Sequence, residues 1–86
     1  MNVSIEITLL PLQDEFESSI IKFINALRAS KFKVLENPMS TQIYGPFNEV
    51  MPFLNQLIEE TFIDLENVVL NLKLVKSDRS NYEPHL

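Results

Sequence analysis

The sequence has no cysteine and only one histidine among its 86 residues. Without cysteine, disulfide bonds and thiol catalysis are excluded, and the thiolate ligands that many zinc sites use are missing. The single histidine, His85, stands next to the C-terminus, so a Ser-His-acid arrangement would lack a rigidly held base. The adjacent acids Glu59 and Glu60 would point apart on a helix, which makes them poor joint metal ligands. We therefore expect no catalytic residue, no metal site and no enzymatic activity.

Glycine and basic residues are also scarce. Gly45 is the only glycine, whereas loops that cradle phosphate groups need several. Seven Lys and Arg stand against twelve Asp and Glu, a net charge of −5, which repels nucleic-acid backbones and anionic membranes. No apolar run reaches the roughly 18 residues of a membrane span, and the first residues do not resemble a signal peptide. We expect a cytoplasmic protein that binds neither nucleic acid nor membrane.

Alternation of apolar and polar residues is the strongest pattern that the chain does contain. Val3, Ile5 and Ile7 alternate with polar residues until Pro11, which is typical of a half-buried strand. The β-branched and aromatic content of two shorter runs, separated by Asn37-Pro38, indicates a hairpin. The predicted strands cover residues 3–10, 32–36, 41–44 and 68–75.

Two stretches have helical spacing instead. The first helix is predicted over about residues 14–30, with Asp14 and Glu17 as a capping pair. The second is predicted from Asn48, as its cap, to about Phe62, with Pro52 tolerated in the first turn. The apolar stripes expected to face the core are Phe16, Ile20, Phe23, Ile24 and Leu27 in the first helix, and Val50, Leu54, Leu57, Ile58 and Phe62 in the second.

The resulting order, β-α-β-β-α-β, predicts an α+β fold. With right-handed crossovers it is the ferredoxin-like sandwich, a four-stranded antiparallel sheet with both helices on one face. Residues 1–76 form this domain, and residues 77–86 are a C-terminal tail or an arm that docks on another subunit. A core this small, under a partly apolar open sheet face, predicts a homo-oligomer. The open face is expected to carry Ser4, Glu6, Thr8, Leu10, Asn71, Lys73 and Val75.

Two features could belong to a ligand site. Glu6 is an acid in the middle of a strand that is central in this topology; it either pairs with Lys73 on the neighbouring strand or accepts a hydrogen bond from an amine of a ligand. Ser40 and Thr41, close to Asn37, either satisfy the backbone of the hairpin or line a pocket. If Ile43 belongs to the core, alternation places Thr41 on its face, with Ser40 and Tyr44 opposite.

Three segments together resemble the YkoF-like thiamine-binding family, over residues 2 to about 76. They are Val3-Ser4-Ile5-Glu6-Ile7 through Pro11, Asn37-Pro38-Met39-Ser40-Thr41-Gln42-Ile43-Tyr44-Gly45, and Glu49-Val50-Met51. The Met-Ser-Thr element is the most specific of them. The resemblance implies a ferredoxin-like fold, homodimers or homotetramers, no cofactor, and non-catalytic binding of thiamine or its hydroxymethylpyrimidine moiety. It places Met39, Ser40, Thr41 and Glu6 in the ligand site, with Asn37 and Tyr44 as neighbouring candidates.

An alternative remains within the same fold. The chain could be a structural or regulatory oligomerisation module without a bound vitamin, in which residues 37–41 serve only as hairpin and interface. If thiamine is the ligand, we expect the unphosphorylated form, because Lys33 is the only basic residue near the motif and a phosphate would need more.

Overall fold

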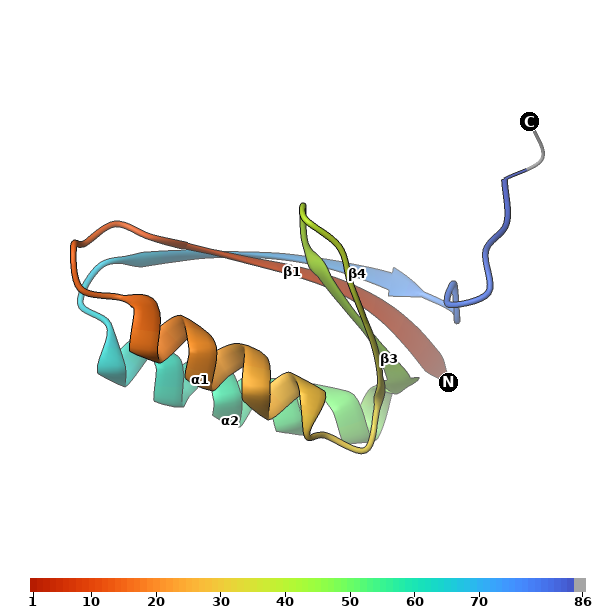
Figure 1. Cartoon of the computed structure of the whole chain (residues 1–86). Coiled ribbons are helices and arrows are strands. Elements are labelled where there is room, and N and C mark those ends of the chain that lie inside the picture. Colours follow the sequence, from red (N-terminus) through yellow and green to blue (C-terminus); the bar gives the residue numbers. More distant parts are fainter. Residues whose placement is uncertain (85–86) are drawn as a thin grey trace.

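A computed structural model describes residues 1–84 as one sheet with two helices on one face (Figure 1). The elements are β1 (Asn2–Pro11), α1 (Glu17–Arg28), β2 (Lys33–Glu36), β3 (Thr41–Pro46), α2 (Phe47–Asp64) and β4 (Val68–Lys76). The strands lie in the order β2-β3-β1-β4, and every neighbouring pair is antiparallel. The predicted ferredoxin-like βαββαβ sandwich is therefore confirmed. His85 lies outside the described residues.

The core lies between β1, β3 and the two helices. Val3, Ile5 and Ile7 of β1 are at most 2% exposed, because alternation puts all three side chains on the helix side of the sheet. Their buried partners are Ile43 of β3, Phe23 and Leu27 of α1, and Val50, Leu54 and Leu57 of α2. None of the helices within residues 1–84 has the length and apolarity needed to span a bilayer.

Helix α1 starts later than its sequence pattern predicts. Its N-cap is Phe16, which makes no side-chain cap hydrogen bond, so the capping pair of Asp14 and Glu17 is wrong. The preceding segment is instead held by the loop between α2 and β4. The Gln13 Oε1 atom accepts hydrogen bonds from the backbone N–H groups of Glu66 and Asn67, at 2.9 and 3.1 Å. These tertiary bonds fix Gln13 against that loop, and the helix begins only at Glu17.

Helix α2 starts earlier and ends later than predicted. Pro46 is its N-cap, so Asn48 is not the cap, and Pro52 stands inside the helix beyond its first turn. The buried stripe continues from Leu57 to Thr61 rather than to Phe62. Thr61 satisfies its hydroxyl by donating to the Leu57 carbonyl at 2.8 Å, whereas Phe62 is 47% exposed. A hydroxyl with an intrahelical acceptor costs little to bury. Thr61 is therefore buried because of its position on the helix, although Phe62 is the more apolar residue.

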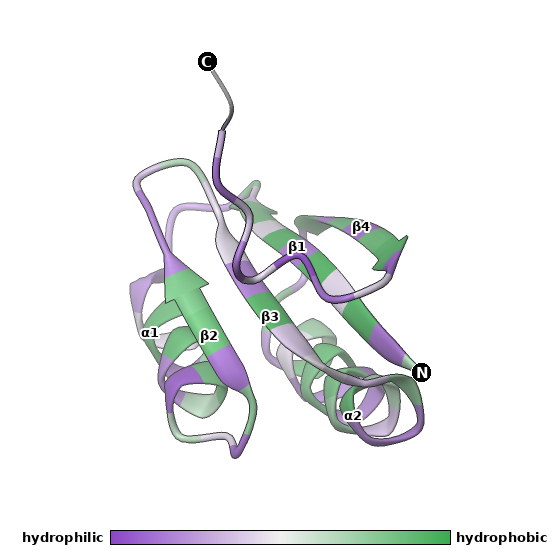
Figure 2. Ribbon diagram, turned by 90° about the vertical axis from the view of Figure 1, so that its right-hand side faces the viewer, coloured by the Kyte–Doolittle hydropathy of each residue, from purple (hydrophilic) through white to green (hydrophobic). Residues whose placement is uncertain are grey.

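The open face of the sheet carries the predicted side chains. In the register of β1, Glu6 lies between Gln42 of β3 and Lys73 of β4. The segment after β4 passes over this face, in front of β1 and β3 (Figure 2). There Ser4 Oγ donates to the Ser77 carbonyl at 2.7 Å and accepts from the Arg79 N–H at 2.8 Å. Residues 77–79 are thus tied to the sheet of their own chain.

Gly45 is required for packing rather than for backbone freedom. A Cβ atom built at this position would lie 2.7 Å from Cδ1 of Phe32. The Phe32 ring in turn packs against Phe53 of α2, with ring centroids 5.5 Å apart. The missing side chain of Gly45 therefore lets an aromatic ring lie directly against β3.

We predict that Gly45→Ala lowers the free energy of unfolding by about 1–3 kcal/mol, because the added methyl group overpacks the Phe32 ring. Urea unfolding followed by circular dichroism measures the change. In a Phe32→Leu background the same substitution should cost clearly less, since the smaller side chain can yield. An equal cost in both backgrounds would contradict the packing explanation.

Candidate ligand-binding site

The turn between β2 and β3 is organised by its first residue. The Asn37 Oδ1 atom accepts hydrogen bonds from the backbone N–H groups of Met39 and Ser40, at 2.8 and 3.0 Å. The Asn37 N–H donates to the Ser40 carbonyl at 3.1 Å and closes the turn. Pro38 restricts φ at the next position, which favours the same turn. Asn37 therefore has the hairpin role that its residue type predicts.

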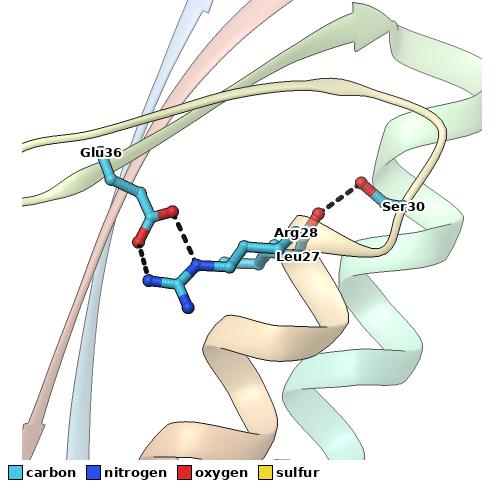
Figure 3. Close-up of polar contacts among 4 residues, drawn as sticks. All are labelled: Leu27, Arg28, Ser30 and Glu36. Carbon is cyan, nitrogen blue, oxygen red and sulfur yellow. Dashed lines mark hydrogen bonds and ion pairs between the residues drawn. The ribbon is translucent and has the colours of Figure 1, made fainter.

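The turn is also anchored to the end of α1. Arg28 at the C-terminal end of α1 forms a two-pronged ion pair with Glu36, the residue before Asn37 (Figure 3). Its Nε and Nη2 atoms donate to the two carboxylate oxygens at 2.8 and 3.0 Å. The hydrogen bond from Arg28 lowers the pKa of Glu36 below its ordinary value. Because the pair is exposed, we assign it an orienting role rather than a large share of stability.

A cavity of about 220 Å³ lies beside this turn, on the helix side of the sheet. Its lining comes from residues 37–41, from residues 7–9 of β1, and from Ile20, Phe23 and Ile24 of α1. None of these lining side chains is titratable. The volume is below the roughly 300–1,000 Å³ of typical drug-sized pockets, so the cavity suits one small ring rather than a large cofactor.

The motif has side chains on both faces of the sheet. Thr41 is 8% exposed, on the same face as the core residue Ile43, and lines the cavity. Its hydroxyl makes no hydrogen bond within residues 1–84. Ser40 Oγ instead donates to Glu6 Oε2 at 3.0 Å and accepts from Gln42 Nε2 at 2.6 Å. Ile43 is a core residue, and the prediction for that case, with Thr41 on its face of the strand and Ser40 on the other, matches this arrangement.

The structure does not bring the predicted ligand-binding residues to one place. Asn37, Met39 and Thr41 line the cavity, whereas Glu6 and Tyr44 lie on the open face, behind the sheet. Ser40 also lines the cavity, but its hydroxyl donates to Glu6 on the open face. There they line a smaller cavity of about 90 Å³. Of the two interpretations left open for Glu6, the pairing with Lys73 is present, with Nζ 3.7 Å from Oε1.

The sequence pattern did not identify part of the site. Ile20, Phe23 and Ile24 were predicted as core residues, and they are also the apolar wall of the cavity. Residues 7–9 were predicted only as strand. Gln42 belongs to the same sequence motif but has no predicted role, although its Nε2 donates to the Ser40 hydroxyl that in turn donates to Glu6. Helical or alternating spacing marks such residues as buried but does not show where packing is incomplete.

Tyr44 is partly buried on the open face, where it lines the smaller cavity together with Glu6. Burial raises the pKa of its phenol above the ordinary value, and the nearby charges of Asp78 and Glu6 raise it further. At neutral pH the phenol is therefore protonated and can donate a hydrogen bond.

Fold and cavity together define a small ferredoxin-like protein with an uncharged cavity beside its central hairpin. The family model for thiamine-binding protein matches residues 5–84, so the chain belongs to the thiamine-binding protein family. This finding confirms the family resemblance of the sequence. Comparison with curated protein sequences finds no match.

Solved structures agree on the fold. A Streptococcus pneumoniae protein is 26% identical with a TM-score of 0.80, over 91% of this chain and 89% of that one. A candidate thiamine biosynthesis or salvage protein of Thermotoga maritima is 20% identical, with a TM-score of 0.77 over 90% and 85% of the two chains. A hypothetical protein of Methanocaldococcus jannascii is 24% identical, with a TM-score of 0.70 over 95% and 84%.

We predict that Asn37→Ala lowers the free energy of unfolding by about 1 kcal/mol, because two turn amides lose their acceptor. Asn37→Asp keeps an acceptor oxygen at the same place and should stay close to the wild type. Urea unfolding of both variants measures the difference. If both variants lose the same stability, the side-chain acceptor does not hold the turn.

We predict that Tyr44 titrates above the ordinary tyrosine pKa of about 10. Tyr82→Phe leaves Tyr44 as the only tyrosine, so phenolate absorbance reports this group alone. Because the folded state favours the protonated phenol, its contribution to stability is present below pH 10 and is lost as pH rises through the raised pKa. A midpoint at or below the ordinary value would contradict the prediction.

Proposed function

We propose that this chain is a non-catalytic binding protein for thiamine or its hydroxymethylpyrimidine moiety. The observation that carries the proposal is the uncharged cavity lined by Met39, Ser40 and Thr41, the most specific element of the family resemblance. Membership of the thiamine-binding protein family supports it. The absence of titratable side chains among the lining residues also favours binding without catalysis.

The chemistry of the cavity suits the pyrimidine ring of the vitamin. Phe23 and the neighbouring apolar residues of α1 offer contact to a flat ring. The hydroxyl of Thr41, which has no partner within residues 1–84, and the amide nitrogen of Asn37 can pair with its polar edge. Met39 is 84% exposed at the rim, and its flexible thioether can fold over a bound ring. A ring held this way leaves the rest of the vitamin outside the cavity.

Charge favours the unphosphorylated form. No basic side chain is among the residues that line the cavity. A phosphate on the part of the vitamin that lies outside the cavity would face a protein whose net charge is −5, which repels an anion. The cationic thiazolium ring would instead lie toward the surface of a protein whose net charge is −5. The proposed ligand is therefore thiamine itself or the free pyrimidine.

Self-association is part of the proposal. β4 is an edge strand, and its Val69, Leu72 and Leu74 are 40%, 37% and 44% exposed. An apolar edge strand of this kind favours pairing with another chain. We accordingly propose a homodimer or homotetramer, acting in the cytoplasm, where a chain without cysteine is at no disadvantage.

The alternative is an oligomerisation module that binds no vitamin. Its support is that Asn37 and Ser40 already have internal partners, in the turn and on Glu6. The two functions differ in one measurable respect, which is heat of binding on addition of thiamine or hydroxymethylpyrimidine.

We predict that calorimetry detects binding of both compounds and that Thr41→Val weakens it roughly 2- to 12-fold, the equivalent of one hydrogen bond. Stability should hardly change, because valine has the same shape and the hydroxyl has no partner in the described chain. Thr61→Val is the control: it removes a buried hydroxyl of α2 away from the cavity and should leave affinity unchanged. Folded wild-type protein that gives no heat at millimolar concentrations of either compound would refute the proposed function.

A further inference from the structure

Strand β1 is longer than its pairing with β3. It pairs with β3 from Asn2 to Ile7, where Ile7 lies opposite Thr41, the first residue of β3. Its pairing with β4 continues to Pro11, opposite Val68. Beyond Ile7, the side of β1 that faces β3 has no strand partner within the described residues. We call this stretch the bare edge of β1, and it adjoins the cavity.

The direction of the backbone groups on this edge follows from two hydrogen bonds. In an antiparallel strand, the N–H and C=O of one residue point to the same side, and successive residues alternate. Leu12 N–H donates to the Asn67 carbonyl at 2.8 Å, toward β4, and the Met1 carbonyl accepts from Phe47 N–H at 2.9 Å, on the side of β3. Odd-numbered residues of β1 therefore point toward β3, and Leu9 is the first of them beyond the last pair.

The hairpin does not cover this edge. Continuing the register of Ile7 and Thr41 would put Met39 opposite Leu9, but the N–H groups of Met39 and Ser40 bond to the Asn37 side chain. Within residues 1–84 no backbone hydrogen bond joins Leu9 to the turn. Leu9 is itself among the residues that line the cavity.

We infer that the main-chain N–H and C=O of Leu9 form the recognition edge of the cavity, for a heterocycle that presents a ring acceptor next to an amino donor. In a 4-aminopyrimidine the ring nitrogen accepts from the N–H, and the amino group donates to the C=O. The inference deepens the proposed function and rests on it. It assigns ring recognition to backbone groups, which no inspection of side-chain types reveals.

The backbone groups of Leu9 are well suited to distinguish an aminopyrimidine from a 4-oxopyrimidine because the strand holds them in place. The β4 ladder fixes β1 from the other side through residues 8–11, so Leu9 needs no reordering when a ligand arrives. A 4-oxo analogue presents a ring N–H where the aminopyrimidine has an acceptor, and an oxygen where it has a donor. It would face the Leu9 N–H with a donor and leave buried polar groups unpaired.

The first test removes the backbone donor. Leu9→Pro deletes the N–H without touching the β4 ladder, and Pro11, with the same orientation, shows that β1 accommodates proline there. Leu9→Ala is the matched control, because it shortens the side chain and keeps the N–H. By calorimetry with thiamine, we expect Leu9→Pro to bind roughly 5- to 100-fold more weakly than Leu9→Ala. Equal affinities of the two variants would overturn the inference and leave the proposed function intact.

The second test leaves the protein unchanged. Wild-type protein is titrated with thiamine and with its 4-oxo analogue, and we expect the analogue to bind at least about 10-fold more weakly. If the two compounds bind equally, the edge does not read the amino group, and the inference fails even if Leu9→Pro does not fold.

Hydrogen exchange of the Leu9 amide gives a readout in the free protein. We expect this amide to exchange much faster than that of Ile7, and to slow when thiamine or hydroxymethylpyrimidine is added. Slow exchange in the free protein would overturn the inference, since the N–H would already be bonded. If neither thiamine, hydroxymethylpyrimidine nor cytosine, as a generic 4-aminopyrimidine, shifts the Leu9 signal, both the inference and the recognition of this ligand class fail.

Discussion

The pairing of β1 with strands on both of its sides is the constraint on which the rest of the structure depends. Its register with β3 and β4 puts Val3, Ile5 and Ile7 under the helices and leaves Glu6 on the opposite face. The burial of these apolar side chains drives the two helices onto one face of the sheet. β1 extends beyond its pairing with β3. Its residues up to Ile7 pack in the core, and residues 7–9 line the cavity.

The hairpin between β2 and β3 completes this arrangement by turning away from β1. Asn37 takes up two turn amides, and the ion pair between Arg28 and Glu36 holds the base of the turn against α1. The space left between α1, β1 and the turn is the cavity. Its polar character comes from side-chain hydroxyl and amide groups and from main-chain groups rather than from charges, which is why a neutral ring suits it better than an anion.

Much of this could be predicted from local patterns, and particular residues show where such patterns end. Alternation correctly separated Glu6 from Ile5 and Thr41 from Ser40, because the faces of a strand depend only on position. The predicted helix caps were wrong. Gln13 bonds to the loop between α2 and β4, which is distant in sequence, and α2 begins directly after β3 with Pro46 as its N-cap. Local capping patterns show neither feature. The family resemblance assigned Glu6 and Thr41 to one ligand site without placing them in space, and in the structure the sheet lies between their side chains.

The sequence by itself determined the order of elements, the faces of the strands and the family to which the chain belongs, since these follow from periodicity and from a short local motif. Only the tertiary structure decided that Glu6 bonds Ser40 behind the sheet and that Leu9 is left with a bare edge. Both depend on where neighbouring strands stop relative to one another. That difference in length arises from contacts between distant segments, and no local pattern encodes it.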